Sequence, residues 1–424
     1  MKKTIPTIPK TEQAIIVIID LPERNTWPFE ERKKEFEKLV SSCGVEIAED
    51  FTCKIKQITP KFFIGKGKIE EIAEDVMMFD ADVVIFSEDL SPSQQKNLEE
   101  MLNCKTIDRT QLILDVFAQR ARSNEGKVQV ELAQLIYLLP RLSGKGIILS
   151  RIGGGLGTKG PGEQKLEIDR RRVRERIGKL KKILKDISDQ RKTQRMQRDK
   201  ISSTLIALVG YTNSGKSTLF NVLTESQVKV KDQFFSTLDP TIRKITLSNN
   251  RTALLSDTVG FLNELPHHLI ESFKATLEEV INADILIHVL DISDNCIMQK
   301  KDAVIEILNE LKTGNKPLFT VLNKSDKIDD SAEFGKIQKR LKACAVVSAL
   351  KKRGLEEIRK SITEYIEKDM VELKLNIPHE KAHVIVFLRK MGVKFEEKYS
   401  EKGVYIKAKI SSRECASIRK IMKN

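Results

Sequence analysis

Aromatic side chains and paired cysteines are scarce in this sequence. Phe, Tyr and Trp together make up 5% of the 424 residues, and a single residue is Trp. Base stacking on aromatic platforms is therefore not the expected mode of a nucleic-acid contact. The cysteines are scattered, and no two form a C-x-x-C pair (Cys43, Cys53, Cys104, Cys296, Cys344, Cys415). This pattern argues against a zinc site and favours reduced thiols in a cytosol.

Long hydrophobic runs are also missing. The apolar run Ile15–Ile19 near the N-terminus is only as long as a strand and is followed by Asp20-Leu21-Pro22. Because a membrane helix needs about 20 apolar residues, the sequence predicts neither a signal peptide nor a membrane span. We expect a cytoplasmic monomer.

What the sequence has in excess is positive charge. The formal net charge is +14 and the pI is near 9.3. These values point to a polyanionic partner, either nucleic acid or an anionic membrane surface. The 40% hydrophobic content fits a soluble chain with substantial cores, and at roughly 100–200 residues per domain the length predicts about three domains.

Strand-like and helix-like segments alternate in residues 1–108. The strand-like segments are 14–19, 53–58, 83–86 and 105–107, and the helical ones are 29–42, 69–78 and 92–102. Such alternation predicts a small N-terminal α/β domain with a parallel or mixed sheet. The second of these helices is preceded by Gly65-Lys66-Gly67-Lys68. A structural turn is the favoured interpretation of these glycines, and a nucleotide contact is the alternative.

Residues 109–200 are predicted to form a long helical hairpin. Apolar residues recur at helical steps from Arg109 to Leu139, before Pro140, and at heptad spacing within 163–200. We expect an antiparallel coiled coil whose tip is a glycine-rich basic loop at 143–162. Residues 163–200 carry 15 Lys/Arg against 7 Asp/Glu. This excess favours rRNA or another phosphate backbone as the partner, with a solvated helix that binds nothing as the alternative.

A phosphate-binding loop stands near the start of the next segment, residues 201–368. It reads G-x-x-x-x-G-K-S and follows the apolar run Leu205–Val209 (Gly210, Tyr211, Thr212, Asn213, Ser214, Gly215, Lys216, Ser217). In such a loop the backbone amides surround the phosphates, Lys216 reaches the outer phosphates, and the Ser217 hydroxyl ligates Mg²⁺. Asn213 is compatible with a K⁺ ion beside the phosphates or with a hydrogen-bonded cap of the loop.

A second turn, about forty residues later, is predicted to meet the same metal ion. It reads D-x-x-G and follows a strand (Asp257, Thr258, Val259, Gly260). Asp257 can hold Mg²⁺ through water, and the Gly260 amide can contact the terminal phosphate only while that phosphate exists, which makes the turn a switch. Phe261 follows where many small GTPases carry a water-orienting glutamine, so we expect slow hydrolysis that needs a partner.

The segment between these two motifs is predicted to close over the nucleotide (Phe235, Ser236, Thr237, Leu238, Asp239). A threonine here supplies a second protein hydroxyl to Mg²⁺. Thr237 and Thr241 both qualify, and spacing alone does not choose between them.

The base is selected by an N-K-x-D motif (Asn323, Lys324, Ser325, Asp326). Asp326 can accept two hydrogen bonds from guanine, whereas adenine would leave buried polar groups unpaired. Asn323 is expected to tie this loop to the phosphate loop, and the Lys324 stem to cover the base. The backbone of Ser348-Ala349-Leu350 can contact the guanine carbonyl. These motifs, in this order, predict a Ras-like P-loop GTPase domain.

Residues 369–424 are predicted to form a small basic α+β domain with the order strand, helix, strand, hairpin strand, helix. Residues 371–424 hold 13 Lys/Arg against 6 Asp/Glu. The charge favours a second contact with a ribosome-like partner, and a plain solubilising surface is the alternative.

Several segments together resemble the HflX-type GTPases. They are Gly153–Glu163, Arg109–Phe117, Gly65–Lys68 and Phe235–Thr241. The resemblance runs from about residue 12 to the end of the nucleotide domain, and the C-terminal segment is consistent with it. The family tip often reads G-G-x-G-T-R-G-P-G-E. Lys159 replaces the arginine here and an extra glycine precedes, which keeps a phosphate contact but weakens planar stacking.

The resemblance implies a GTPase that binds the 50S (large) ribosomal subunit, or whole ribosomes, and takes part in splitting or rescue of stalled ribosomes or in ribosome biogenesis. It places the tip loop near rRNA of the catalytic centre. It assigns Mg²⁺ to Ser217 and Thr237, and makes Lys216, Thr237 and Gly260 the catalytic candidates. It also implies that some members bind ATP in the N-terminal part, where Gly65–Lys68 is the candidate.

Two other classes of function stay open from the sequence. One is a structured-RNA binding module that nucleotide merely stabilises, without regulated turnover. The other is a tRNA-modification GTPase, which would need a catalytic cysteine or a cofactor domain, and neither is arranged in this sequence.

Overall fold

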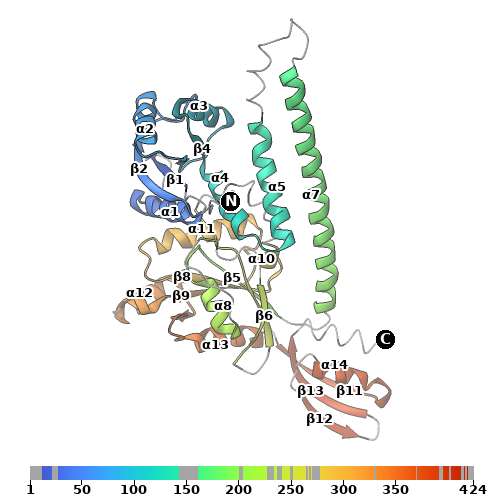
Figure 1. Cartoon of the computed structure of the whole chain (residues 1–424). Coiled ribbons are helices and arrows are strands. Elements are labelled where there is room, and N and C mark those ends of the chain that lie inside the picture. Colours follow the sequence, from blue (N-terminus) through green and yellow to red (C-terminus); the bar gives the residue numbers. More distant parts are fainter. Residues whose placement is uncertain are drawn as a thin grey trace, which may run out of the picture. The chain divides into compact units, whose positions relative to one another are not determined.

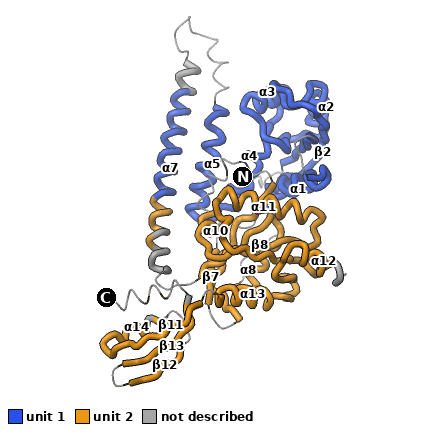
Figure 2. The backbone as a smooth tube through the Cα atoms, turned by 180° about the vertical axis from the view of Figure 1, so that it is seen from behind, with its two compact units in different colours: residues 1–185, 232–238, 265–274 blue, residues 186–231, 239–264, 275–424 orange. Residues whose placement is uncertain are grey.

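The computed structural model describes residues 12–21, 27–142, 161–199, 204–226, 234–235, 241–248, 252–263, 277–328, 331–368, 370–390, 395–400 and 403–411, together with 266, 269, 415 and 418. The chain forms two compact units (Figure 2). Unit 1 comprises residues 1–185, 232–238 and 265–274, and unit 2 comprises 186–231, 239–264 and 275–424. The four segments expected from the sequence stay a prediction, because the two units cut across them.

Unit 1 is built on a four-stranded parallel sheet. Its order is β2 (Glu46–Lys54), β1 (Gln13–Asp20), β3 (Val83–Phe86) and β4 (Lys105–Ile107). The two central strands are buried apolar runs, as parallel strands covered on both faces require. The edge strand β2 is half exposed and mixes charged with apolar residues. The sequence expectation of a strand at 53–58 was therefore wrong, because an edge strand need not show a continuous apolar run.

Helices cover this sheet: α1 (Phe29–Ser42), α2 (Lys66–Met78), α3 (Pro92–Leu102) and α4 (Arg109–Arg120). Gly65 is the N-cap residue of α2. A capping box between Ser91 and Gln94 starts α3. The Asp108 carboxylate caps α4 by accepting the Gln111 amide at 2.8 Å.

The single helical stretch expected over 109–139 is in fact two helices. After α4 the chain breaks at residues 121–123, and Ser123 caps a second helix, α5 (Asn124–Arg141), by accepting the Gly126 amide at 2.8 Å. Most of the apolar residues of α4 are buried in the core of unit 1. The sequence held a signal for this break, because residues 122–127 carry no apolar side chain and include Ser123 and Gly126.

Arg141 fastens the far end of α5 to the α/β part of unit 1. Its guanidinium donates to the buried Asp108 carboxylate at 2.9 Å, to the Leu90 carbonyl at 2.8 Å and to the Gln95 side chain at 2.9 Å. It also stacks on the Tyr137 ring, 3.4 Å from the centroid. One side chain thus links α5 to the N-cap of α4 and to α3.

Helix α7 (Pro161–Asp199) lies antiparallel beside α5 (Figure 1). Val128 and Leu132 of α5 pack with Leu180 of α7, and Arg176 donates to Glu131 at 2.7 Å. Leu180 is the one buried α7 side chain among those described between residues 167 and 191. The heptad residues of α7 therefore pack against α5 over only a short stretch of the helix. Residues 143–160, which hold most of the expected tip loop, lie outside the described residues.

Unit 2 contains a six-stranded sheet with the order β10 (Ala345–Val346), β9 (Leu318–Asn323), β8 (Ile285–Asp291), β5 (Leu205–Val209), β7 (Thr252–Asp257) and β6 (Thr241–Thr246). Its neighbouring strands are parallel except for β6, which runs antiparallel to β7. This is the α/β architecture that the sequence predicted, with the nucleotide motifs at the carboxyl ends of the strands.

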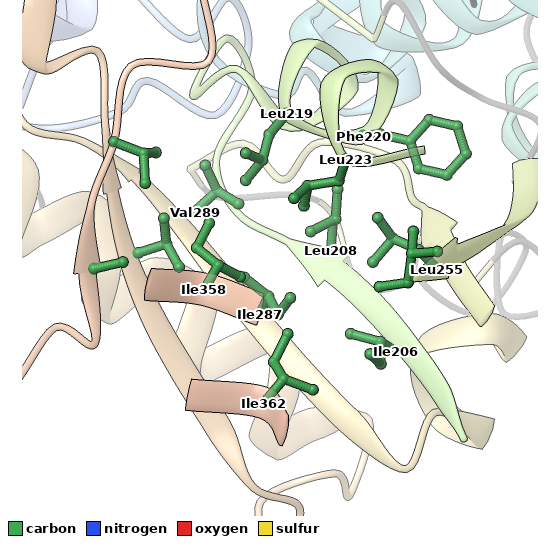
Figure 3. Packing of buried hydrophobic residues seen from close by; sticks show 14 of the residues in the cluster. Ile206, Leu208, Leu219, Phe220, Leu223, Leu255, Ile287, Val289, Ile358 and Ile362 are labelled. Carbon is green, nitrogen blue, oxygen red and sulfur yellow. The ribbon is translucent and has the colours of Figure 1, made fainter. Parts of the chain in front are cut away.

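Helices pack on both faces of this sheet. One core joins α8 (Lys216–Thr224) and α13 (Leu355–Lys368) to β5, β7 and β8, as Figure 3 shows. A second cluster involves α11 (Ile297–Glu310) and α12 (Ser331–Leu341). The short helix α10 (Glu278–Asn282) holds Glu278, which accepts a hydrogen bond from Ser188 of α7 at 3.0 Å.

The C-terminal part of unit 2 forms a three-stranded antiparallel sheet with the order β11 (Met370–Ile377), β13 (Gly403–Ser411) and β12 (Phe395–Ser400). Helix α14 (His383–Lys390) packs on one face through Val384 and Leu388. The predicted order of elements is confirmed as far as β13, and the last predicted helix falls mostly outside the described residues. No helix within the described ranges is long and apolar enough to span a membrane.

Candidate functional site

The phosphate-loop residues turn sharply between β5 and α8. Gly215 has a φ of +90°, and a Cβ built there would lie 2.2 Å from the Asn323 side-chain nitrogen. Gly210 has a φ of +156°, and its Cβ would lie 2.4 Å from the Val289 carbonyl oxygen. Both positions therefore require glycine, for backbone conformation and for space. The loop ends at the N-terminus of α8, where backbone amides favour an anion.

Lys216 is a buried cation inside this loop. Its side-chain nitrogen donates to the carbonyl oxygens of Gly210 at 3.0 Å and Tyr211 at 2.8 Å. Burial lowers the pKa of Lys216 to about 8, although Asp257 acts in the opposite direction. A buried ammonium held by carbonyl oxygens alone lacks a full counter-charge, so phosphate oxygens are the ligands that this group suits best.

The two predicted metal-binding motifs meet directly. The Ser217 hydroxyl donates to the Asp257 carboxylate at 2.7 Å, and both side chains are buried. A hydroxyl beside a carboxylate, next to a phosphate loop, matches the oxygen ligands and water-mediated contacts that Mg²⁺ uses with nucleotides. The residues present therefore fit the ion.

The D-x-x-G turn is attached to the phosphate loop through the backbone. The Thr212 amide donates to the Phe261 carbonyl at 2.8 Å, and the Phe261 amide donates to the Gly210 carbonyl at 3.1 Å. Thr258 is fully buried and bonds the Leu208 carbonyl, and Val259 is also buried. A Cβ on Gly260 would lie 2.9 Å from the Thr212 methyl carbon. A movement of the D-x-x-G turn would therefore also displace the phosphate loop.

Asn323 connects three loops. Its amide nitrogen donates to the Ser214 carbonyl of the phosphate loop at 3.0 Å, and its amide oxygen accepts the Ala349 amide at 3.0 Å. The side chain is 2% exposed. Sequence reasoning expected the first of these bonds, while the second was not expected.

The other base-binding candidates surround this link. Ser325 donates its amide to the Val347 carbonyl at 3.1 Å, and Asp326 accepts a hydrogen bond from the Ser348 hydroxyl. Ala349 is buried, whereas Leu350 is 71% exposed. The N-K-x-D turn, which continues into the short helix η1 (Ser325–Lys327), and the Ser348–Leu350 segment are thus joined by hydrogen bonds.

Sequence reasoning missed Asp291 at the carboxyl end of β8. Its carboxylate contacts the Lys324 ammonium at 2.8 Å and accepts a hydrogen bond from Ser293. Lys324 has a φ of +64°, so this ion pair fixes a side chain on a turn that most residues avoid. An acidic residue that directly follows a buried strand run was the available signal.

Buried polar atoms in the phosphate loop indicate whether a ligand fits there. Within the described residues, the hydroxyls of Thr212 and Ser214 are buried and have no hydrogen-bond partner. Such orphaned groups are uncommon in folded proteins and often mark a ligand site. Asn213 has a φ of +59° and is exposed, and its geometry is compatible with either role expected for it.

The expected Mg²⁺-closing segment is only partly described. Phe234 and Phe235 are buried in unit 1, where the Phe235 and Phe117 ring centroids are 4.4 Å apart and the Phe234 amide donates to the Ser42 hydroxyl at 3.2 Å. Ser236, Thr237, Leu238 and Asp239 lie outside the described residues. Thr241 begins β6 opposite Asp257.

The Gly65–Lys68 candidate does not line a cavity that the described part of unit 1 contains. That cavity has a volume of about 540 Å³, and Cys43, Lys105 and Asp115 are among its lining residues. Lys66 and Lys68 instead pair with Glu70 at 3.4 Å and Glu71 at 2.7 Å along α2.

Three family models match the chain. They are "GTP-binding GTPase N-terminal" over residues 30–118, "GTP-binding GTPase Middle Region" over 120–198 and "50S ribosome-binding GTPase" over 205–324. The first begins after β1 and covers the rest of the α/β part of unit 1, and the second covers α5 and most of α7. The third covers the phosphate loop, the D-x-x-G turn and the start of the base-selecting turn.

Curated relatives align over most of the chain. "GTPase HflX" of Caldanaerobacter subterraneus subsp. tengcongensis is 43% identical over 401 residues, which cover 94% of this chain and 91% of the relative. "GTPase HflX" of Escherichia coli is 42% identical over 374 residues, covering 88% and 87%. Among solved structures, a GTP-binding protein from Sulfolobus solfataricus in complex with GDP is 28% identical, covers 84% of this chain and 98% of that chain, and has a TM-score of 0.44.

Proposed function

Since the chain belongs to the HflX family of GTPases, we propose that its hydrolysis of GTP to GDP and phosphate is coupled to association with the large (50S) ribosomal subunit in the cytoplasm. In this proposal the protein acts as a monomer in splitting or rescue of stalled ribosomes, or in ribosome biogenesis. The predicted parts at 1–108, 109–200, 201–368 and 369–424 would serve this cycle as the N-terminal domain, hairpin, GTPase domain and second ribosome contact.

One observation carries the proposal for the nucleotide site. The buried Asn323 side chain joins the phosphate loop at Ser214 to the Ala349 backbone, beside Asp326. Phosphate recognition and base recognition are therefore parts of one hydrogen-bonded unit. We infer that Asp326 reads guanine, that the Lys324 stem covers the base, and that Ser348–Leu350 contacts the guanine carbonyl.

The metal would be held by Ser217 and Thr237, with Asp257 acting through water. When bound, Mg²⁺ neutralises charge on the terminal phosphates. Lys216 orients those phosphates, and the Gly260 amide contacts the terminal one. Loss of that phosphate removes the contact at Gly260 and frees the turn, which is the switch. A K⁺ ion beside Asn213 would add positive charge at the same place.

Slow basal turnover is part of this proposal. Phe261 follows Gly260, is 2% exposed and is held in the loop by two backbone hydrogen bonds. Its side chain has no group that can orient an attacking water. The ribosome is therefore expected to complete the catalytic arrangement.

The large-subunit partner is supported by charge and by relatives. Helix α7 exposes a dense set of arginines and lysines, and the family model that matches residues 205–324 is described as a 50S ribosome-binding GTPase. We infer that the partner includes rRNA, because phosphates are the natural ligands of such a surface.

The test is GTP turnover by the full chain with and without purified 50S subunits. Turnover that rises at least about tenfold with subunits supports coupled hydrolysis. Unchanged turnover, together with binding, would instead support an RNA-binding module that nucleotide stabilises. Preference for ATP over GTP in the same assay would remove the guanine assignment.

A further inference from the structure

A cavity of about 540 Å³ lies where the parallel strands of unit 1 begin. Four of its lining residues start or directly precede the strands β1, β2, β3 and β4 (Glu12, Val45, Val83 and Lys105). Four more lie at or just after the carboxyl ends of α1 and α4 (Cys43, Gly44, Ala118 and Gln119). The Gln119 side chain donates to the Cys43 carbonyl at 2.9 Å, which joins the two helix ends. The cavity is therefore preformed, and its volume is typical of small-molecule sites.

The position of this cavity in the fold favours a positively charged ligand. Helices α1 and α4 both end at the cavity, and the carboxyl end of a helix carries a partial negative charge. Nucleotide phosphates bind at the opposite edge of a parallel sheet, where strands end and helices begin. The cavity is therefore suited to a cation and unsuited to a phosphate.

Two carboxylates at the cavity lack a protein partner. Within the ranges that the structure describes, neither Glu12 nor Asp115 makes a side-chain hydrogen bond or ion pair. Asp115 is half-buried, and burial raises its pKa, although Lys105 acts in the opposite direction. A partly buried carboxylate without a bonded counter-charge costs free energy, so an ammonium ion beside it would be stabilising.

The other lining groups define the body of the ligand. Most of them are apolar (Val45, Val83, Ile85, Ile107 and Leu112). Cys43 adds a neutral thiol, because burial raises the pKa of this thiol to about 12. Lys105 is the one cation among the described lining residues, and nearby Arg120 donates to the Ser42 carbonyl at 3.3 Å. The lining therefore has an excess of negative charge, and it matches a ligand with one positive group and a hydrocarbon body.

We propose that this cavity binds a small aliphatic amine in its ammonium form. The ammonium group contacts Asp115 and Glu12, and the alkyl chain packs on the apolar lining. The net charge of the chain is +14, so amines are repelled from most of the remaining surface. The site lies in unit 1 alone and needs neither GTP nor a ribosome. This inference therefore goes beyond the proposed function and is tested independently of it.

Calorimetric titration of the full chain with pentylammonium chloride tests the site, with pentanol as the uncharged probe and leucine as the zwitterionic probe. Pentanol should bind at least about tenfold more weakly than pentylammonium, because it loses a charge-assisted hydrogen bond. Lys105→Gln should tighten pentylammonium binding, because it removes a like charge. No binding of pentylammonium to the wild type overturns the proposal. Tighter binding of leucine, weakened by Lys105→Gln, overturns the cation assignment, since Lys105 would then hold the carboxylate of the ligand.

Asp115→Asn is the deciding variant, with Asp75→Asn as its matched control. Asp75 is also a half-buried helical carboxylate of unit 1, on α2, and does not line the cavity. Only Asp115→Asn should weaken pentylammonium binding, by about tenfold, and neither change should lower the melting temperature. Ala118→Phe, at an exposed lining position, should abolish binding by filling the cavity. Unchanged binding of Asp115→Asn or of Ala118→Phe overturns the proposal.

Thiol labelling locates the bound amine in the wild type. Cys43 lines the cavity, whereas Cys344 is a half-buried thiol of unit 2. Saturating pentylammonium should slow the reaction of Cys43 with a maleimide and leave that of Cys344 unchanged. Peptide mass spectrometry measures both rates. If Cys43 reacted equally fast with and without the bound amine, the amine would lie elsewhere and the proposed site would be wrong.

Discussion

The loops at the carboxyl ends of the six-stranded sheet and the outer face of α7 obtain their chemistry in opposite ways. In the loops, Lys216, Asn323 and Asp257 are buried. Lys216 is held by carbonyl groups of its own phosphate loop, whereas Asn323 and Asp257 bond to another segment of the chain. On the outer face of α7 the side chains of Arg171, Arg172, Arg174, Lys181, Lys182 and Lys185 are exposed to solvent. A loop substitution therefore disturbs geometry and stability together, whereas an α7 substitution changes charge alone. The following predictions test this division.

The largest effect is expected from Lys216→Ala. The change removes the ammonium that faces the phosphates, so kcat/KM for GTP should fall by at least about 100-fold. Steady-state phosphate release checks this, with the exposed Lys336→Ala as control. Undiminished hydrolysis would show that the site lies elsewhere.

A large pH effect is expected from His288 in the middle of β8. Neither ring nitrogen has a partner within the described residues, and burial lowers the pKa of His288 to about 3. The unfolded chain has the ordinary pKa of about 6.5, so between pH 6.5 and 3 only the unfolded state takes up the proton. The free energy of unfolding is therefore highest above pH 6.5 and declines as the pH falls, by about 5 kcal/mol in all.

Urea unfolding of unit 2 between pH 4 and 7 measures this effect. His288→Leu should flatten the acid side of the profile, because the uptake site is gone, while the exposed His379→Leu should leave the slope as it is. If the unfolding free energy of His288→Leu fell as steeply with pH as that of the wild type, the acid destabilisation would come from other groups.

An intermediate effect is expected from Asn323→Ala. The Ser214 carbonyl and the Ala349 amide both lose their buried partner, which should cost about 3 kcal/mol of unfolding free energy and weaken GTP binding. Exposed Asn376→Ala serves as control. A variant with normal stability but weak binding would mean that the link serves the ligand alone.

The smallest effect is expected on α7. Reversing Arg170, Arg171 and Arg172 to Glu should weaken 50S binding by about tenfold and flatten its salt dependence, with basal GTP hydrolysis unchanged. Sedimentation over a salt series measures both, and reversal of Lys336, Lys339 and Arg340 on α12 is the control. An equal loss of basal hydrolysis would contradict the comparison, because it would show that α7 and the nucleotide-site loops do not act independently.

The sequence predicted most where chemistry restricts residue choice. Gly210, Gly215 and Asn323 occupy the places that their motif requires, because backbone geometry and buried hydrogen bonds admit few other residues. It predicted less where tertiary context decides. The edge strand β2 carries charges that hide it. The break between α4 and α5 was missed although the polar residues 122–127, with Gly126, interrupt the helical period. Asp291 was missed although it ends a buried strand run, because the sequence does not show that its partner is Lys324.

The hydrogen bonds of Arg141 to Asp108, Leu90 and Gln95 determine which residues first bear a force applied to the hairpin of α5 and α7. The chain leaves α5 at Arg141, so a pull from residue 142 onward reaches this clamp before it reaches the turn at residues 121–123. Helix α5 is then held at both ends, at the turn of residues 121–123 and at Arg141, and it cannot rotate about the turn alone. Mechanical strain is then passed first to Leu90, Gln95 and Asp108, and α5 cannot swing away without breaking these hydrogen bonds.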